Sequence, residues 1–445
     1  MPAKIRADRI FLGLSSFQAL AMFRRGIFYT FLAVYLRAEL GLSVTETTLF
    51  ETIPMILNVL FQTFVWGRLT DHLQKRRSLI IVGELLASAG HILMWYFHAI
   101  APNTRASAYV IITSLTIIEA FWSMSNIGWS AYISDAYDVE ERNAVQGSFA
   151  SIGGLGRIAG AMAGGLLYDA MGKAPAGWGY SRGSIFFTAA FVMAVSVIPL
   201  FFMPEGGVDF RKKGEKAPPA RLKASGKAEA LTTAYVSSGN SSLLGFLIFL
   251  LAMLLINSGI NSLAAFRGQF LDLRDGFAAS PPQISLAVNV EAAVLIIIGF
   301  FIGIMGRKMG IKKLLLFGSA AGIVSMLLHA AAPSLLVVYA GAAFRGLSEG
   351  CVASSSYAYA STLIPPEKRG RYFAYYNATF FLSWGVAATF IIGPLIDALI
   401  KSGQNEVFAF RMGLASGAVL MAIGLALLLL LFAFGKRKGP IQNGG

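Results

Sequence analysis

The sequence predicts an all-α membrane protein in which twelve transmembrane helices form two pseudo-symmetric six-helix bundles. The mean hydropathy is +0.64 and only 13% of the residues are charged, whereas about a quarter are charged in soluble proteins. About 20 apolar residues cross the hydrocarbon core of a bilayer, so a chain of 445 residues has room for about a dozen spans. A polar segment between two early apolar runs also recurs in the second half, which indicates a duplicated unit.

Apolar runs separated by charged loops place the individual helices. We expect them at residues 10–36, 46–69, 78–99, 107–134, 145–170, 184–203, 243–270, 283–305, 312–331, 334–362, 371–398 and 406–434. Residues 1–203 and 243–435 then form the two bundles. The polar stretch 204–242 is rich in Lys and Arg and predicts a flexible cytoplasmic linker, and residues 436–445 form a cytoplasmic tail.

The basic residues set the expected orientation in the membrane. If both termini lie in the cytoplasm, 25 of the 37 Lys and Arg residues fall at cytoplasmic helix ends, in the linker and in the tails. Positive charge is retained on that side of membrane proteins. The net charge of +14 therefore indicates topology and not a nucleic-acid partner. We expect a multi-pass protein of the plasma (cytoplasmic) membrane with cytoplasmic N- and C-termini.

Three landmarks recur in the same order in both halves of the chain. Such internal symmetry in a strongly apolar sequence is typical of transporters built from repeated bundles. The copies have diverged, because Arg307 stands where the first copy has Asp71. The landmarks are residues 67–77, which match 303–313, residues 141–142, which match 368–369, and residues 165–169, which match 393–397.

Residues 67–77 read Gly-Arg-Leu-Thr-Asp-His-Leu-Gln-Lys-Arg-Arg, which resembles the signature of the loop between the second and third helices of the major facilitator superfamily. The resemblance implies a transporter whose halves move between two states, with this loop as a cytoplasmic latch. It assigns the acid to Asp71, close helix approach to Gly67, and the basic cluster to Lys75, Arg76 and Arg77. A charged cluster of this kind can favour one state and still break.

Further residues of the expected cytoplasmic gate lie near the loop between the fourth and fifth predicted helices. Asp135, at the end of the fourth helix, is the candidate second acid, and Arg142 follows it. Two positions depart from the superfamily pattern: His72 replaces the usual arginine and Gln74 the usual glycine. Because the second copy lacks the acid, only the first copy is expected to act as a latch. The alternative is that these charges only enforce topology.

Seven charged residues fall in the middle of predicted helices. A charge at the bilayer centre costs at least several kcal/mol, so each must face a cavity or a partner. The resemblance implies that helices one, four, seven and ten line the transport path and that two, five, eight and eleven flank it. The seven charges lie on lining or flanking helices, which predicts a central polar site. They are Arg24, Arg25, Glu119, Arg157, Glu291, Arg345 and Glu349.

The two kinds of charge suggest two roles. Arginine keeps its charge and offers a planar fork that suits carboxylate or phosphate, so the four arginines are candidate ligands of an anionic substrate. The three glutamates can take up a proton when buried and are candidates for proton coupling. Of the adjacent pair, we expect Arg24 and not Arg25 to face the cavity. Alternatively, Arg345 and Glu349, four residues apart, only neutralise each other.

Aromatic and amide side chains on three lining or flanking helices complete the candidate substrate site. Such groups could stack on a substrate ring and bind its polar atoms. Helix packing and the interfacial aromatic belt remain the alternative. The residues are Trp122 and Asn126 on the fourth helix, Asn257 and Asn261 on the seventh, and Tyr376 and Asn377 on the eleventh.

The sequence shows no Walker loop, nucleophile elbow or metal-ligand cluster, so we expect neither an enzyme nor a cofactor or metal site. We expect a monomeric secondary active transporter that moves a small organic anion by alternating access, with proton symport. Proton-coupled efflux of drug-like or amphipathic compounds is the alternative within this class. A membrane receptor or sensor that transports nothing is the alternative from another class.

Overall fold

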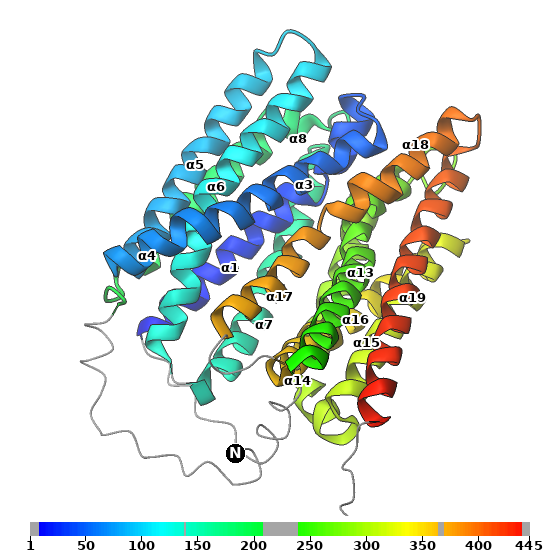
Figure 1. Ribbon diagram of the computed structural model, residues 1–445. Helices are drawn as coiled ribbons and strands as arrows, with labels where there is room; N and C mark the ends of the chain where they lie inside the picture. The colour runs from blue at the N-terminus through cyan, green and yellow to red at the C-terminus, as the bar shows by residue number, and fades with distance from the viewer. Residues whose placement is uncertain (1–8, 138, 208–238, 364–368, 438–445) are drawn as a thin grey trace, which may run out of the picture.

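The computed structural model describes residues 9–137, 139–207, 239–363 and 369–437. Every regular element of these residues is helical. Figure 1 shows the helices in two bundles, the first coloured blue to blue-green and the second green to red. Side chains of Asp71 and Arg142 lie outside the description, as do residues 208–238 of the expected linker and 438–445 of the expected tail.

The first bundle contains all helices up to residue 201. Its first span runs through a π-helical turn, and its second span is interrupted by another. The elements are α1 (Arg9–Tyr29), α2 (Leu32–Val34), η1 (Tyr35–Glu39), α3 (Val44–Phe61), η2 (Gln62–Trp66), α4 (Gly67–Leu73), α5 (Arg76–Ala99), α6 (Thr104–Ala136), α7 (Val139–Tyr168), α8 (Trp178–Ser181), α9 (Ser184–Ser196) and α10 (Ile198–Phe201).

The second bundle repeats this order of spans. Its eleventh span is broken between two helical pieces that meet at an angle of 42°. The elements are α13 (Gly239–Asp272), α14 (Pro281–Met309), α15 (Ile311–Ala331), α16 (Leu335–Leu363), α17 (Arg369–Ser383), η4 (Ala388–Ile392), α18 (Gly393–Lys401) and α19 (Glu406–Arg437).

The described residues confirm the predicted fold class. Eleven helices are long and apolar enough to cross a membrane, and the bent pair of α17 with η4 and α18 makes a twelfth span. Each predicted helix end lies within six residues of the corresponding end in the structure. Successive spans alternate in direction. The described chain therefore begins and stops at one end of the molecule, which we call the terminal end, and the opposite end is the distal end.

The hydrophobic cores of the bundles merge at the distal end. One core cluster is built around the first bundle but includes Leu271, Ala279 and Ile284 of the second. The core of the second bundle in turn includes Val44, the first residue of α3. All these residues lie within about two turns of the distal helix ends. The two bundles are thus packed together at that end.

A row of glycines brings α7 against α1. A Cβ on Gly156 would lie 2.1 Å from the carbonyl oxygen of Ala19, and one on Gly160 would lie 2.0 Å from that of Phe23. Small residues four apart allow such approach between membrane helices. Because α7 also carries Arg157, this contact fixes where that arginine stands in the membrane.

We therefore expect Gly160→Ala to lower the free energy of unfolding by about 1–3 kcal/mol, because the added methyl overlaps the backbone of α1. Gly147→Ala on the same helix is the matched control, since nothing lies within 4 Å of its Cβ position. The control should be neutral or stabilising by up to about 1 kcal/mol. Thermal unfolding of the purified variants measures both, and equal melting temperatures would contradict the packing.

Candidate functional site

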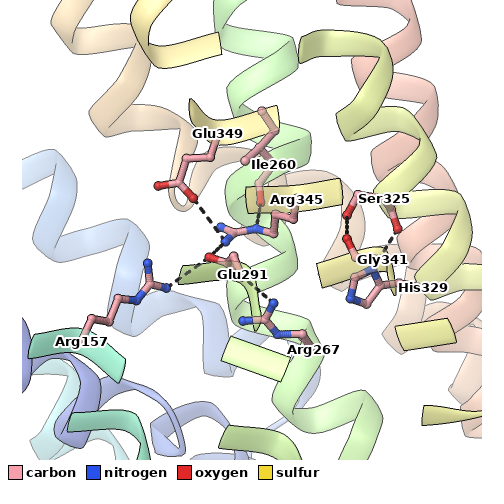
Figure 2. A network of polar contacts seen from close by, with 9 residues as sticks. All are labelled: Arg157, Ile260, Arg267, Glu291, Ser325, His329, Gly341, Arg345 and Glu349. Atoms are coloured by element: carbon pink, nitrogen blue, oxygen red, sulfur yellow. Dashed lines mark hydrogen bonds and ion pairs between the residues drawn. The ribbon is translucent and has the colours of Figure 1, made fainter. Parts of the chain in front are cut away.

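Three arginines converge on one buried glutamate in the middle of the molecule (Figure 2). Glu291 on α14 is fully buried, and its Oε2 accepts a hydrogen bond of 2.6 Å from Arg267 on α13. Its Oε1 forms an ion pair with Arg345 on α16 and lies 3.4 Å from Nη2 of Arg157 on α7. Glu349 lies 3.5 Å from Arg345 at the edge of the cluster. The contact of Arg157 with Glu291 joins the two bundles.

The backbone around the cluster positions Arg345. Its Nε donates a hydrogen bond of 3.1 Å to the carbonyl oxygen of Ile260 on α13. The next residue, Gly346, lets α16 touch α14, because a Cβ there would lie 2.3 Å from the carbonyl oxygen of Glu291. Arg345 and Glu291 are therefore held together by the close contact of their helices.

The cluster has an excess of positive charge. Arg157, Arg267 and Arg345 carry three formal positive charges, and Glu291 with Glu349 carries two negative ones. A buried ion is stable only when it is paired and hydrogen-bonded, so Glu291 depends on its three partners and they depend on it. The contact of Arg345 with Glu291 means that Arg345 and Glu349 do not simply neutralise each other, as the alternative from the sequence held. The arrangement can hold one further anionic group.

Arg25 lies among aromatic rings from both bundles. Its guanidinium carbon is 5.6 Å from the ring centre of Trp122 and 5.8 Å from those of Tyr29 and Trp384. Arg24 is 3% exposed and lies over Trp122, 5.8 Å from its centre. Arg25 thus contacts rings of both bundles, whereas the ring described beside Arg24 belongs to the first bundle. Which of the two arginines faces a central cavity stays a prediction.

Glu119 belongs to a chain of amides in the first bundle. Asn58 donates a hydrogen bond of 2.7 Å to its carboxylate, and Gln62 donates one of 2.5 Å to Asn58. Glu119 is 6% exposed. The described hydrogen bond to this carboxylate thus comes from a neutral amide, in contrast to Glu291, while Arg25 and Arg24 interact with it electrostatically.

Three charged residues inside the spans were missed in the sequence. Arg267 is a central member of the cluster, and Glu51 on α3 interacts electrostatically with Arg25 and Arg345. Glu84 is fully buried on α5 and accepts a hydrogen bond of 2.8 Å from Ser125. Since α5 is the third span, mid-membrane charges are not confined to lining and flanking helices. Each of the three is visible as a lone charge within an apolar run.

The predicted amide and aromatic residues are not gathered at one place. Asn261 donates a hydrogen bond of 2.8 Å to Ser383, which ties α13 to α17 within the second bundle. Tyr376 exchanges a hydrogen bond of 2.7 Å with Ser356 and stacks on a neighbouring phenylalanine, so it packs within that bundle. Asn257 is buried, Asn126 is half-buried and Asn377 is exposed. Trp122 alone of this group lies against the central arginines.

The loop of residues 67–77 forms contacts inside the first bundle. Arg76 donates to Asp135 at 3.1 Å, to the carbonyl oxygen of Thr70 at 2.5 Å and to Gln74 at 3.1 Å. Gln74 has φ +53°, the left-handed region that favours glycine, and this explains why the superfamily pattern has glycine at that position. Lys75 is exposed beside it.

Two further features of this loop differ from expectation. A Cβ on Gly67 would meet only the carbonyl oxygen of Gln62 in its own span, at 2.9 Å, so this glycine accommodates the π-helical turn and not a neighbouring helix. Arg77 donates a hydrogen bond of 2.5 Å to the carbonyl oxygen of Met203 and lies 3.5 Å from Glu205. Glu205 also accepts a hydrogen bond from the backbone amide of Ser78. The described partners of the basic cluster thus belong to the first bundle in this conformation.

A polar cavity of about 800 Å³ lies at the distal end and is lined from both bundles. Charged residues of both signs line it, among them Arg37, Arg274, Asp275 and Lys401. Of the seven charges predicted inside the membrane, none is among its described lining residues. It is therefore a vestibule separate from the arginine cluster. No group of three or more His, Cys, Asp or Glu that could hold a metal occurs among the described residues.

Comparison with known proteins identifies the family. The model of the Major Facilitator Superfamily matches residues 14–274 and 266–444, and the chain belongs to this superfamily. It is a multi-pass integral membrane protein with a transporter fold. No curated protein matches the sequence significantly.

Solved structures share the fold at low identity. The nucleoside transporter NupG is 14% identical with a TM-score of 0.67, over 95% of this chain and 99% of that one. A bacterial homologue of the human lysosomal transporter Spinster, inward-facing and unoccupied, is 14% identical with a TM-score of 0.67, over 97% and 98%. A peptide transporter, POT, in complex with sulfate is 14% identical with a TM-score of 0.66, over 96% and 94%.

We expect Glu291→Gln to lower the free energy of unfolding by about 3–5 kcal/mol, because it leaves the buried Arg267 and Arg345 and the half-buried Arg157 without their shared carboxylate. Glu349→Gln is the control, since Glu349 has one ion pair, at 3.5 Å, and its side chain is 27% exposed. It should cost about 1 kcal/mol or less. Thermal unfolding in one detergent compares them, and a Glu291→Gln protein as stable as the control would contradict the described pairing.

Proposed function

We propose that the chain is a secondary active transporter that moves a small organic anion by alternating access. The observation that carries the proposal is the convergence of Arg157, Arg267 and Arg345 on Glu291. Guanidinium groups bind carboxylate and phosphate through paired hydrogen bonds, and these three come from both bundles. An anionic group that binds among them makes contacts that depend on the relative position of the bundles.

Proton symport is the coupling that this chemistry supports. Glu291 is the anion that the three arginines share. If it takes up a proton, the three arginines lose a negative partner and gain affinity for the anion of a substrate. Binding of the proton would then raise the affinity for the substrate, and binding of the substrate would raise the affinity for the proton by the same factor. Glu119 and Glu349 remain further candidates for the proton, and one transport unit of this kind needs only a monomer.

The proposed orientation follows from charge. The helix ends at the terminal end carry most of the basic residues, so this end faces the cytoplasm under the positive-inside rule. Both termini and the segment between the bundles are then cytoplasmic, and the protein resides in the plasma membrane. In this orientation the distal end, where the bundles are packed together, faces the outside of the cell.

A second candidate function is efflux of amphipathic aromatic compounds. It is favoured by Arg25, which lies against Tyr29, Trp122 and Trp384 from both bundles. Such a site could exchange its own cation–π contacts for those of a flat ligand. The two candidates differ in the charge of the ligand that binds, which a direct screen can measure.

The proposal predicts that organic anions raise the melting temperature of the purified protein more than sugars or cationic dyes do, and more at pH 6 than at pH 8. Arg157→Ala should weaken anion binding by about 10–100-fold, the loss of one or more charged hydrogen bonds. Arg68→Ala, which changes an exposed arginine at the terminal end, is the control and should leave affinity unchanged.

Uptake into proteoliposomes then tests coupling. An imposed proton gradient should drive accumulation of the anion identified by the screen. After collapse of the gradient, the anion should only exchange across the membrane without accumulating. Stabilisation by cationic dyes alone would replace the anion proposal by the efflux candidate. Anion uptake that is indifferent to the gradient would refute proton symport.

A further inference from the structure

One carboxylate links the distal ends of the two bundles through backbone hydrogen bonds. Asp397, on α18 of the second bundle, accepts a hydrogen bond of 3.0 Å from the amide of Val44 and one of 2.9 Å from that of Thr45. Both amides belong to the first turn of α3 in the first bundle. The bonds join residues more than 350 positions apart in the chain.

The carboxylate supplies acceptors that the first turn of α3 lacks, because the first four amides of a helix have no partner inside the helix. Ser43 and Glu46 form a capping box and satisfy each other's amides. The amides of Val44 and Thr45 remain, and the carboxylate of the other bundle binds both. A carboxylate at a helix N-terminus also interacts favourably with the helix dipole.

The backbones beside the carboxylate are in close contact. A Cβ on Gly393 would lie 3.0 Å from the Cα of Thr45, and one on Gly385 would lie 2.4 Å from the Cα of Thr52. The Thr389 hydroxyl lies 2.5 Å from that of Thr52. Asp397 therefore stands at the end of a continuous contact between α3 and the broken span of α17, η4 and α18, which Figure 1 shows side by side.

The internal repeat provides a natural comparison. Asp169, at the end of α7, occupies the position of Asp397 in the first copy, and Ser280 begins α14 as Ser43 begins α3. The residues after Ser280 are Pro281 and Pro282, which have no amide hydrogen to donate. Asp169 instead accepts a hydrogen bond of 3.0 Å from Gly172 in its own bundle. The corresponding contact is thus absent in the other copy for a reason visible in the sequence.

We propose that Asp397 is a one-sided distal clamp, a positioning residue that holds the two bundles together at this end by completing the cap of α3. The clamp is reversible because water can satisfy two amides and one carboxylate when the bundles separate. Opening of the distal end therefore requires release of Asp397. The pair of α7 and α14 is joined instead by other contacts, such as the hydrogen bond of 2.9 Å that Ser285 donates to the carbonyl oxygen of Ala161.

Distances between spin labels test the clamp without any substrate, so the outcome is independent of the proposed cargo. Cys351, the single native cysteine, is replaced by serine. One label pair, at Thr104→Cys and Gln404→Cys, spans the distal end, and another, at Gln146→Cys and Lys308→Cys, spans the terminal end. All four positions are exposed. Electron–electron double resonance of the protein in lipid nanodiscs gives the population of each state.

Asp397→Ala should increase the ratio of distal-open to distal-closed protein by about tenfold, equivalent to about 1.4 kcal/mol, with longer distal and shorter terminal distances. Val44→Pro with Thr45→Pro removes the donors, reproduces the second copy and should have the same effect. Combining both changes should add nothing further. Asp169→Ala is the matched control and should leave both distances as in the parent. Val44→Ala with Thr45→Ala keeps both amides but shortens Val44, which lies in the core that the bundles share, so it should open the distal end less than the double proline variant does.

Two results would overturn the clamp. One is an unchanged distance distribution in both Asp397→Ala and the double proline variant. The other is full additivity when they are combined, which would mean that the carboxylate and the amides act on other partners. A separate result would refute only the proposal that the clamp is one-sided: a change in the distal distances of Asp169→Ala as large as that of Asp397→Ala.

Discussion

The pairing of buried charge at Glu291 is the constraint on which the centre of this protein depends. An unpaired ion in the hydrocarbon interior costs at least several kcal/mol, so Glu291 must keep arginines near it, and those arginines must come from the helices that surround it. Gly346 and the carbonyl oxygen of Ile260 fix Arg345 in place. Arg157 reaches the same carboxylate from the other bundle. The pairing of charge at the centre therefore depends on the relative position of the two bundles.

The two ends of the molecule differ in how the bundles meet. At the distal end, hydrophobic cores merge, backbones touch at Gly385 and Gly393, and Asp397 completes a helix cap. At the terminal end, the described hydrogen bonds of Arg76 and Arg77 go to Asp135 and to the carbonyl oxygen of Met203. Sequence divergence between the repeats has the same character. Arg307 replaces an acid, and Pro281 with Pro282 removes two amide donors, both in the second copy, so the repeats have diverged at both ends of the molecule.

Most of the fold could be predicted from the sequence, because spans of about 20 apolar residues leave a helix as the stable solution in a bilayer. The site was less accessible. Arg267 lies three residues from the predicted end of its helix, where a charge is ordinarily interfacial, and so was not counted among the central charges. The choice of partner for Glu291 depends on helices far apart in sequence. The order of Arg24 and Arg25 depends on helix rotation, since adjacent residues point about 100° apart.

The central claim is that Glu291 occupies the place of a substrate anion among three arginines. Its most direct measurement is the melting temperature of Glu291→Gln protein with and without a saturating panel of small carboxylates and phosphates, beside the parent protein. If the claim holds, an anion that supplies the lost negative charge to the three arginines stabilises Glu291→Gln more than the parent and recovers most of the stability lost. If the panel stabilises the variant no more than the parent, the arginine cluster is a structural support, and the substrate site must be sought elsewhere.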